Sequence, residues 1–460
     1  MPRNSPLAAV AFILIASFLI VFGEAAYCIA GDPVKPGPPL RDPTVTGQSS
    51  GPPLQLDVLI LELKANNPEL QAARKRYEAA LTRPTQEGAL PDPRVTLGWV
   101  SNGYPYPGAG LGTDPTSNIG IQFSQELLFP GKRALLSGIA REEAAAEAQA
   151  YRTRELDLVA RAKERFYDLC LAYESMDLWR RNQYSLRQLA KVAEARYTVG
   201  KAAQQDLIKA NIEVAIVENR LTGLEQKKLS LEAEIGALLN QATDSPLGRP
   251  TATGPLPSLA PLEAWQERAR EASPTLQAQR AWIDSRQLNM QYAHKAYYPD
   301  FDVMSGYYNQ GGMKPMWEFK VQMNIPLFFG RKQRAGLEEA GARLGEAQKS
   351  YRAAELALSA QVRIRHLGAE AARTLMERYS KQIVPQSELA LESSLASYET
   401  GGVDFLSVLS NLNTIREYQL GHLEQQAEYL KALASLEELA GGNAGSPGVE
   451  SAAKPDEVQR

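Results

Sequence analysis

The sequence is poor in the residues that most often build reactive centres. Its 460 residues include two cysteines, Cys28 and Cys170, and three histidines, His294, His366 and His422. None of them has the spacing of a metal site or of a thiol enzyme, so no metal site is expected and no cofactor is implied. Metalloenzyme and thiol chemistry are therefore not favoured.

Paired carboxylates are also weak candidates for catalysis. Glu142-Glu143 and Glu338-Glu339 both lie near the expected starts of long helices, where acidic side chains stabilise the helix dipole. A general acid and base would need positioned partners that the sequence does not offer. We expect a protein that is not an enzyme.

An excess of charge of one sign is lacking as well. The 50 Lys and Arg residues nearly balance the 53 Asp and Glu residues, for a formal net charge of −3, and no dense basic block occurs. Nucleic acid is therefore not expected as a partner.

Long hydrophobic runs are limited to the N-terminus, where residues 7–22 form an apolar run of 16 residues. This run is short for a membrane-spanning helix, which needs about 20 residues, and a basic residue precedes it. We predict a signal peptide over residues 1–30, cleaved after Ala30, that directs the chain to export. Lipidation of Cys28 is the alternative, although the bulky Tyr27 before it is unfavourable for lipoprotein processing. Any further passage through a membrane would have to use strands.

Between a Pro-rich extended segment at 31–54 and a flexible tail at 442–460, the sequence repeats itself. Four short motifs recur in the same order, at offsets of 206, 208, 199 and 201 residues. They are Asn67-Pro68 with Ser273-Pro274, Pro91-Asp92 with Pro299-Asp300, Phe129-Pro130-Gly131-Lys132 with Phe328-Phe329-Gly330-Arg331, and Tyr197-Thr198-Val199-Gly200 with Tyr398-Glu399-Thr400-Gly401. Offsets this long exclude a short solenoid repeat. We therefore predict two structural repeats, 55–244 and 262–441, joined by a linker at 245–261.

Each repeat is predicted to contain one very long helix and two shorter ones. No Gly or Pro occurs from Ile139 to Val199, and apolar residues recur there at helical spacing. We predict long helices at 131–198 and 330–399, each a rod of roughly 100 Å and too long for a compact globule. Pro385 should kink the second rod. The shorter helices are predicted at 56–89, 204–239, 262–296 and 406–439, and in each repeat the pair is long enough to stack end to end beside the long helix.

Four strands are predicted between the helices, at 94–100, 118–125, 301–309 and 317–325. In the last strand every odd-numbered residue is apolar and every even-numbered residue is polar, which is typical of a sheet with one apolar and one wet face. One interpretation is a soluble sheet on a helical core. The other is a set of outer-membrane strands, since strands of about nine residues span that membrane when tilted. The polar side chains of the last strand would then face a barrel lumen: Glu318, Lys320, Gln322 and Asn324.

Four strands cannot close a barrel on their own, because an open edge in lipid leaves backbone groups without hydrogen bonds. The membrane interpretation therefore requires several copies of the chain. Three copies would supply about 12 strands, enough for an aqueous pore.

Together these features resemble the TolC family of outer-membrane efflux channels, over about residues 55–441. The resemblance rests on the two repeats, on the helix turns at 197–207 and 398–409, and on the strand-to-helix corners that contain Pro130, Gly131 and Gly330. It implies a homotrimer, with a 12-stranded β-barrel in the outer membrane continued by an α-helical tunnel through the periplasm. The first corner is most similar to outer-membrane components of heavy-metal resistance-nodulation-division pumps.

The resemblance also implies a role for the helix turns, which form the periplasmic end of the tunnel in the family. Residues there meet the adaptor protein and open the pore when the inner hairpins move. By position, the tip and gate candidates are Tyr197, Gly200, Asp206, Tyr398, Gly401, Asp404, Ser407 and Ser410. Some family members carry acidic residues at the positions of Ser407 and Ser410, so this chain departs from an anionic constriction.

We therefore predict a mainly α fold with a small antiparallel β part, in which duplicated hairpins of long helices and two β-hairpins assemble as the trimeric barrel and tunnel. The predicted function is a passive exit duct for metal ions or small toxic compounds. Its partners would be outer-membrane lipid, a periplasmic adaptor protein and an inner-membrane transporter of the resistance-nodulation-division type. Two alternatives remain open: the exit channel of a type I protein secretion system and, in another class, a soluble periplasmic coiled-coil scaffold or adaptor.

Overall fold

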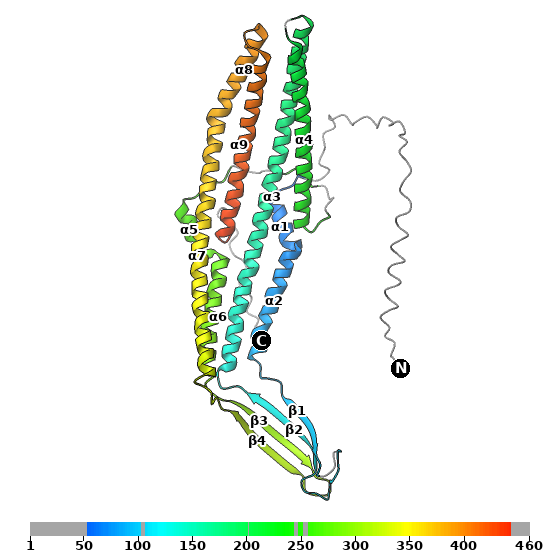
Figure 1. The fold of residues 1–460 in the computed structure, drawn as a ribbon, viewed down its shortest axis with the longest axis vertical. Helices are drawn as coiled ribbons and strands as arrows, with labels where there is room; N and C mark the ends of the chain where they lie inside the picture. Colours follow the sequence, from blue (N-terminus) through cyan, green and yellow to red (C-terminus); the bar gives the residue numbers. More distant parts are fainter. Residues whose placement is uncertain (1–52, 103–105, 201, 243–246, 252–255, 443–460) are drawn as a thin grey trace, which may run out of the picture. The chain divides into compact units, whose positions relative to one another are not determined.

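The computed structural model describes residues 53–102, 106–200, 202–242, 247–251 and 256–442. The predicted signal peptide, Cys28 and the tail beyond residue 442 lie outside the described residues. Within them the chain is mainly helical, with one antiparallel sheet of four strands (Figure 1). The predicted fold class is thus confirmed for the single chain.

The first helical segment of each repeat is broken in two, so the prediction of single helices at 56–89 and 262–296 is wrong. The four helices are α1 (Leu56–Asn66), α2 (Pro68–Gly88), α5 (Leu262–Ala272) and α6 (Pro274–Lys295). The residue before a proline is pushed out of the helical region by a clash with the proline ring. Asn67 and Ser273 accordingly have extended backbones, with ψ of 121° and 119°.

The first long helix, α3, spans Lys132–Thr198 without interruption, and α4 follows it at Gln204–Leu238. In the second repeat the predicted single rod at 330–399 is divided. Its parts are α7 (Lys332–Arg378), a π-helical turn at Tyr379–Ile383 and α8 (Val384–Thr400), and α9 (Phe405–Leu439) comes next. The irregularity expected from Pro385 takes the form of this π turn, which lies just before the proline and accommodates the backbone bond that proline cannot make.

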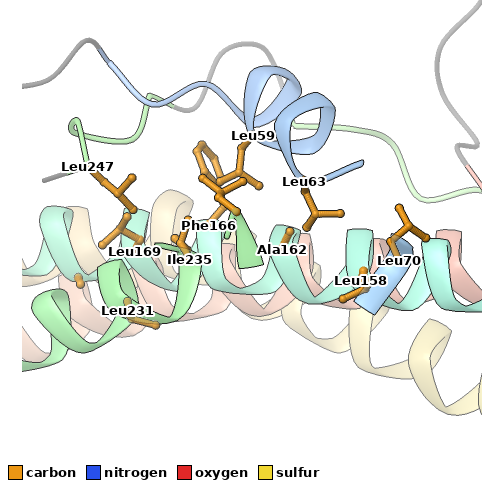
Figure 2. Packing of buried hydrophobic residues seen from close by; sticks show 12 residues of the cluster. Leu59, Leu63, Leu70, Leu158, Ala162, Phe166, Leu169, Leu231, Ile235 and Leu247 are labelled. Atoms are coloured by element: carbon orange, nitrogen blue, oxygen red, sulfur yellow. The ribbon is translucent and has the colours of Figure 1, made fainter. Parts of the chain in front are cut away.

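Helix α3 contacts helices of both repeats. It packs against α2 and α4 of its own repeat and against α6 and α9 of the other (Figure 1). Figure 2 shows how α1 and α2 cover its middle: Leu59, Leu63 and Leu70 pack on Leu158 and Phe166, and Ile235 of α4 joins the same cluster. The short helices α1, α2 and α4 thus pack beside the long helix and share one buried cluster with it. No helix within the described part of the chain has the length and apolar character needed to cross a membrane.

The sheet contains β1 (Arg94–Val100), β2 (Asn118–Leu127), β3 (Asp300–Asn309) and β4 (Met316–Asn324), in that order and antiparallel throughout (Figure 1). Its central pair, β2 with β3, joins the two repeats. The outer edges of β1 and β4 have no strand partner among the described residues.

Candidate functional site

One face of the sheet is apolar and exposed. A row of cross-strand partners runs across all four strands on this face, from Leu97 through Ile121 and Tyr307 to Trp317. The Tyr307 and Trp317 rings meet edge to face, with centroids 5.0 Å apart. The large apolar side chains of this face are between 37% and 76% exposed: Val95, Leu97, Trp99, Ile119, Ile121, Phe123, Leu127, Trp317, Phe319, Val321 and Met323. We call this set the apolar face; a patch of this kind on one chain indicates contact with lipid or protein.

The opposite face of the sheet is polar, and it carries the four residues predicted to line a lumen. Glu318 and Lys320 form an ion pair there, while Gln322 and Asn324 are exposed on the same side of β4. Because successive side chains of a strand alternate between faces, these four residues lie opposite the apolar face. The sheet therefore separates an apolar surface from a charged and polar one.

On the polar face, the Tyr308 ring lies over two glycines, Gly120 and Gly306. A Cβ atom added at Gly120 would lie 2.1 Å from its ring, and one added at Gly306 would lie 2.7 Å from it. The Tyr308 hydroxyl donates a hydrogen bond of 2.8 Å to Glu318 Oε2. The two glycines let the ring lie flat over the strands, and the hydroxyl then fixes the position of Glu318.

At the first strand-to-helix corner, a buried lysine binds an aspartate of the other repeat. Lys132 Nζ lies 2.9 Å from both carboxylate oxygens of Asp300, and its side chain is only 6% exposed. The Phe129 amide donates a 2.7 Å hydrogen bond to Asp300 Oδ1, and the Phe129 ring stacks on Tyr298 with centroids 4.5 Å apart. We call these four residues, Lys132, Phe129, Asp300 and Tyr298, the corner clamp.

The predicted corner residues do not play matching roles in the two repeats. Gly131 has a left-handed backbone with φ of 87° and precedes the first residue of α3, next to Pro130. Gly330 has no such φ, and the residue before α7 is Arg331, with φ of −114°. The sequence motif equated Gly131 with Gly330. By their position before the helix, Gly131 instead corresponds to Arg331, one residue further on.

The first helix turn places its predicted residues at the far end of α3. Tyr197 is exposed in the last turn, and Gly200 follows with a left-handed φ of 71°. Asp206 lies in the first turn of α4, where an acidic side chain interacts favourably with the helix dipole. Gly200 thus acts as the C-terminal cap that the sequence predicted.

The second turn is built differently. Gly401 ends α8 with φ of 86°, and Asp404 caps α9: its carboxylate accepts from the Ser407 amide at 3.1 Å and from the Ser407 hydroxyl. These hydrogen bonds, the one from the hydroxyl first, hold the pKa of Asp404 below its ordinary value of 3.8. Ser410 is exposed one turn further along α9. Asp404 and Ser407 are thus engaged with each other.

Tyr398, by contrast, is buried, with 4% of its surface exposed. The guanidinium of Arg196, from the first repeat, lies over the Tyr398 ring at 4.5 Å from the centroid and donates a hydrogen bond to the Tyr398 carbonyl oxygen. We call this the tip contact. Arg196 is not among the residues predicted from the sequence; the nearly constant repeat offset was the one signal for it, because that offset places the two turns at the same level.

Below the tip contact, the two hairpins share one apolar core. Leu186 and Ala193 of α3, Ala210 of α4, and Phe405 and Val408 of α9 are all buried in it with Tyr398. A second cation contact lies along the same helices: Arg416 of α9 packs over the Trp179 ring at 4.3 Å and donates to Asn182 Oδ1 at 3.3 Å. The hairpin tips are thus joined by contacts that a separation of the hairpins would have to break.

The described residues contain neither a metal-binding cluster nor a reactive thiol. They contain no group of three His, Cys, Asp or Glu side chains placed to bind a metal ion. Burial raises the pKa of the Cys170 thiol to about 12, so a thiolate nucleophile is not available there. What the arrangement offers is a sheet with two different faces and two helical hairpins that contact each other at their ends.

Comparisons with known proteins agree with this geometry. Residues 59–241 and 265–442 match the family described as outer membrane efflux protein. The cobalt-zinc-cadmium resistance protein CzcC of Cupriavidus metallidurans is 24% identical over 303 residues, which cover 64% of this chain and 72% of CzcC. The probable outer membrane lipoprotein SilC of Salmonella typhimurium is 23% identical over 387 residues, 77% of this chain and 78% of SilC.

A solved structure shares the fold. The crystal structure of CusC superimposes with a TM-score of 0.71 at 18% sequence identity, covering 90% of this chain and 100% of the CusC chain. Crystal structures of CusC concern conformational changes that accompany folding and transmembrane channel formation. At this identity the match is informative about architecture, and the two matched ranges of the family fall on the two repeats.

Proposed function

The chain belongs to the outer membrane efflux protein family, and on that premise we propose that it is the trimeric exit duct of a tripartite efflux system. In this proposal the sheet contributes to a barrel in the outer membrane, and the helices continue the barrel as a tunnel in the periplasm. The duct is passive: an inner-membrane transporter supplies the energy and a periplasmic adaptor connects the two.

The observation that carries the proposal is the two-faced sheet. Its apolar side chains are exposed on β1, β2 and β4, whereas the polar face holds Glu318, Lys320, Gln322 and Asn324. A transmembrane barrel needs this alternation, with apolar side chains toward lipid and polar ones toward the lumen. A soluble scaffold would gain nothing from leaving such a surface in water, because each exposed apolar Å² costs about 25 cal/mol relative to burial.

The edges of the sheet support the proposed trimer. Backbone groups at the outer edges of β1 and β4 would lack hydrogen bonds in lipid, and each would cost several kcal/mol. Closure by copies of the same chain removes both edges at once. Three copies supply about 12 strands and leave a lumen wide enough for water and solutes.

The helix turns are the proposed docking site for the adaptor and the proposed gate. Tyr197 and Gly200 lie exposed at one turn, and Gly401 at the other. The tip contact between Arg196 and Tyr398 holds the α8–α9 hairpin against the α3–α4 hairpin. Opening would be a rigid movement of one hairpin relative to the other, with loss of this contact.

For the cargo, we propose heavy-metal ions, delivered by a transporter of the resistance-nodulation-division type. Support comes from the similarity to a cobalt-zinc-cadmium resistance protein. The duct itself would need no metal-binding cluster, because selection of the ion takes place before the cargo enters it.

Two adjacent substitutions test the lipid-facing role of the sheet. Val321 lies on the apolar face and Gln322 on the polar face, so Val321→Asp and Gln322→Asp introduce the same carboxylate one residue apart. An aspartate toward lipid near the middle of a strand costs up to about 3 kcal/mol, whereas one in the lumen costs little. We expect Val321→Asp to abolish the outer-membrane form on cell fractionation and Gln322→Asp to retain it. Equal behaviour of the two variants would contradict the proposal and favour the soluble scaffold.

A further inference from the structure

The corner between β4 and α7 is open, whereas the matching corner between β2 and α3 is held by contacts within the chain. At the first corner Lys132 binds Asp300. The Arg133 guanidinium donates hydrogen bonds of 2.9 and 2.7 Å to the Gly88 carbonyl oxygen. The Phe129 ring is covered by a stacked tyrosine. Both cations and the ring of the first corner are therefore engaged.

The second corner begins with an exposed apolar segment that continues the apolar face beyond the end of β4. Met323 is the last residue of that face on β4, and Ile325 follows it with an exposed side chain. Leu327 and Phe328 are then 74% and 75% exposed, and the Phe329 ring is exposed beside them. An apolar segment left open in this way indicates contact with lipid or protein.

Basic residues follow the apolar segment directly, and no acidic residue occurs from Ile325 to Leu337. Arg331, Lys332 and Arg334 are all exposed. Arg334 is paired with an acidic residue of its own helix, at 2.9 Å. Within the described residues neither Arg331 nor Lys332 has an ion-pair partner. The corner thus presents apolar side chains and, next to them, two unpaired cations.

The equivalence of the two repeats offers these cations no carboxylate. In the first corner Lys132 binds Asp300, which is the strand partner of Asn324. Asn324 corresponds to Ser124 at the offset of 200 residues that relates the starts of α3 and α7, and the strand partner of Ser124 is Arg94. Closure of β4 on β1 of a neighbouring copy with this equivalence would therefore bring a further cation to the corner, in the place that the aspartate has in the first one.

We propose that the second corner binds an anionic phospholipid of the outer membrane. Leu327 and Phe328 insert among the acyl chains. Arg331 and Lys332 bind the headgroup phosphate. The inference rests on the proposed function, which places β4 in that membrane, and it adds the class of lipid and the residues that bind it.

The order of the residues fits the order of layers in a membrane surface. In the proposed function β4 lies in the membrane and α7 continues into the periplasm, so the corner between them lies at the periplasmic leaflet. Aromatic side chains favour this interfacial depth, and basic side chains reach from it to the phosphates. Cations next to the membrane attract anionic headgroups in preference to zwitterionic ones. An anionic lipid therefore satisfies both the apolar segment and the charges after it.

Fluorescence quenching measures the lipid contact at the corner itself. In a Cys170→Ala background, Phe328→Cys is labelled with bimane, and the trimer is reconstituted in nanodiscs of phosphatidylcholine. Part of that lipid is replaced by brominated phosphatidylglycerol or, in parallel, by brominated phosphatidylcholine at the same mole fraction. We expect the anionic lipid to quench the label at least about twofold more strongly, because the cations concentrate it at the corner.

Charge removal then tests the assigned residues. Arg331→Gln combined with Lys332→Gln should abolish most of the preference for phosphatidylglycerol, and so should high salt, which screens exposed charges. Arg343→Gln combined with Lys349→Gln is the matched control, because it removes the same charge from exposed positions further along α7. The control should keep the preference. An equal loss in the two double variants would contradict the assignment.

The alternatives give distinct results. Equal quenching by the two brominated lipids would show lipid contact without selection of the anion, and would overturn the inference. No quenching by either lipid, in a protein that native mass spectrometry shows to be a trimer, would mean that a neighbouring copy covers the corner, for example through Asp92, two residues before Arg94. Both results leave the exit duct intact. A water-soluble monomer that does not enter nanodiscs would overturn the exit duct as well.

Discussion

The guanidinium of Arg196 lies over the ring of Tyr398, 202 residues away in the sequence, at 4.5 Å from its centroid. It also donates a hydrogen bond to the Tyr398 carbonyl oxygen. Arg196 belongs to the last turn of α3 and Tyr398 to the last turns of α8, so this contact connects the ends of two hairpins from different repeats. The Tyr398 hydroxyl is buried and has no hydrogen-bond partner in the described part of the chain.

Loss of the tip contact should favour the open duct. Arg196→Ala removes a stacked cation and a charged hydrogen bond, together worth about 2 kcal/mol, which corresponds to a roughly 30-fold shift toward separated hairpins. We expect a higher mean conductance than that of the wild type in planar bilayers.

Tyr398→Phe is the matched control, because it keeps the ring and the carbonyl and removes only the hydroxyl that has no partner. It should conduct like the wild type. If Arg196→Ala leaves the conductance unchanged, the tip contact has no part in gating.

The Asp404 cap should make the start of α9 sensitive to acid. The folded chain lowers the pKa of Asp404, so the stabilisation is present above the carboxyl's ordinary pKa of 3.8 and is lost as the pH falls through the lowered value. At neutral pH, Asp404→Ala should speed hydrogen exchange in the first turn of α9, and the difference from wild type should vanish in acid. Asp206→Ala, in the other turn, should leave α9 protected. Persistence of the Asp404→Ala difference in acid would argue against a cap by the ionised carboxylate.

Gly120 and Gly98 should respond differently to the same change. Both lie on the polar face, but a Cβ at Gly120 would meet the Tyr308 ring at 2.1 Å, whereas one at Gly98 has nothing within 4 Å. Gly120→Ala should therefore displace Tyr308 from Glu318 and destabilise the sheet by about 1–3 kcal/mol. Gly98→Ala should be neutral within about 0.5 kcal/mol. Thermal unfolding in detergent measures both, and equal losses would show that Tyr308 is free to move.

Removal of one member of the corner clamp should be more costly than removal of both charges. Lys132→Met leaves the partly buried Asp300 carboxylate without its cation, which should destabilise the protomer by about 3 kcal/mol. With Asp300→Asn added, the amide oxygen can still accept from the Phe129 amide, so part of the stability should return. Chemical unfolding in detergent gives both values. If the double variant is no more stable than Lys132→Met, the clamp is not an ion pair that depends on both charges.

The alternation in the sequence was sufficient to predict the strands and the two faces of the last one. Trp317, Phe319, Val321 and Met323 were predicted on one face and their polar neighbours on the other, and β4 has this arrangement because a strand repeats every two residues. The long helix before Gly200 could also be predicted from the sequence, since neither Gly nor Pro occurs from Ile139 to Val199.

At other positions the backbone preferences of proline and glycine, and not the hydrophobic pattern, determined where the helices begin and end. Asn67 and Ser273 looked like helix interior, yet the prolines that follow them force an extended residue and end the helices. Gly131 and Gly330 looked equivalent by motif, but only Gly131 has a left-handed backbone, and the structural offset is 200 rather than 199 residues.

The partners at the tips could not be predicted from sequence. Arg196 and Tyr398 are brought together because α3 packs against the hairpin formed by α8 and α9. No local sequence pattern predicts a contact between residues so far apart in the chain. The motif did identify Tyr398 and Gly401 as special, because a glycine after a long helix marks its end.

The most direct test of the account is the mass and membrane location of the mature protein, measured by outer-membrane fractionation followed by native mass spectrometry in detergent. We expect a trimer recovered from the outer membrane, whose apolar face requires detergent. A water-soluble monomer or dimer in the periplasmic fraction would contradict it.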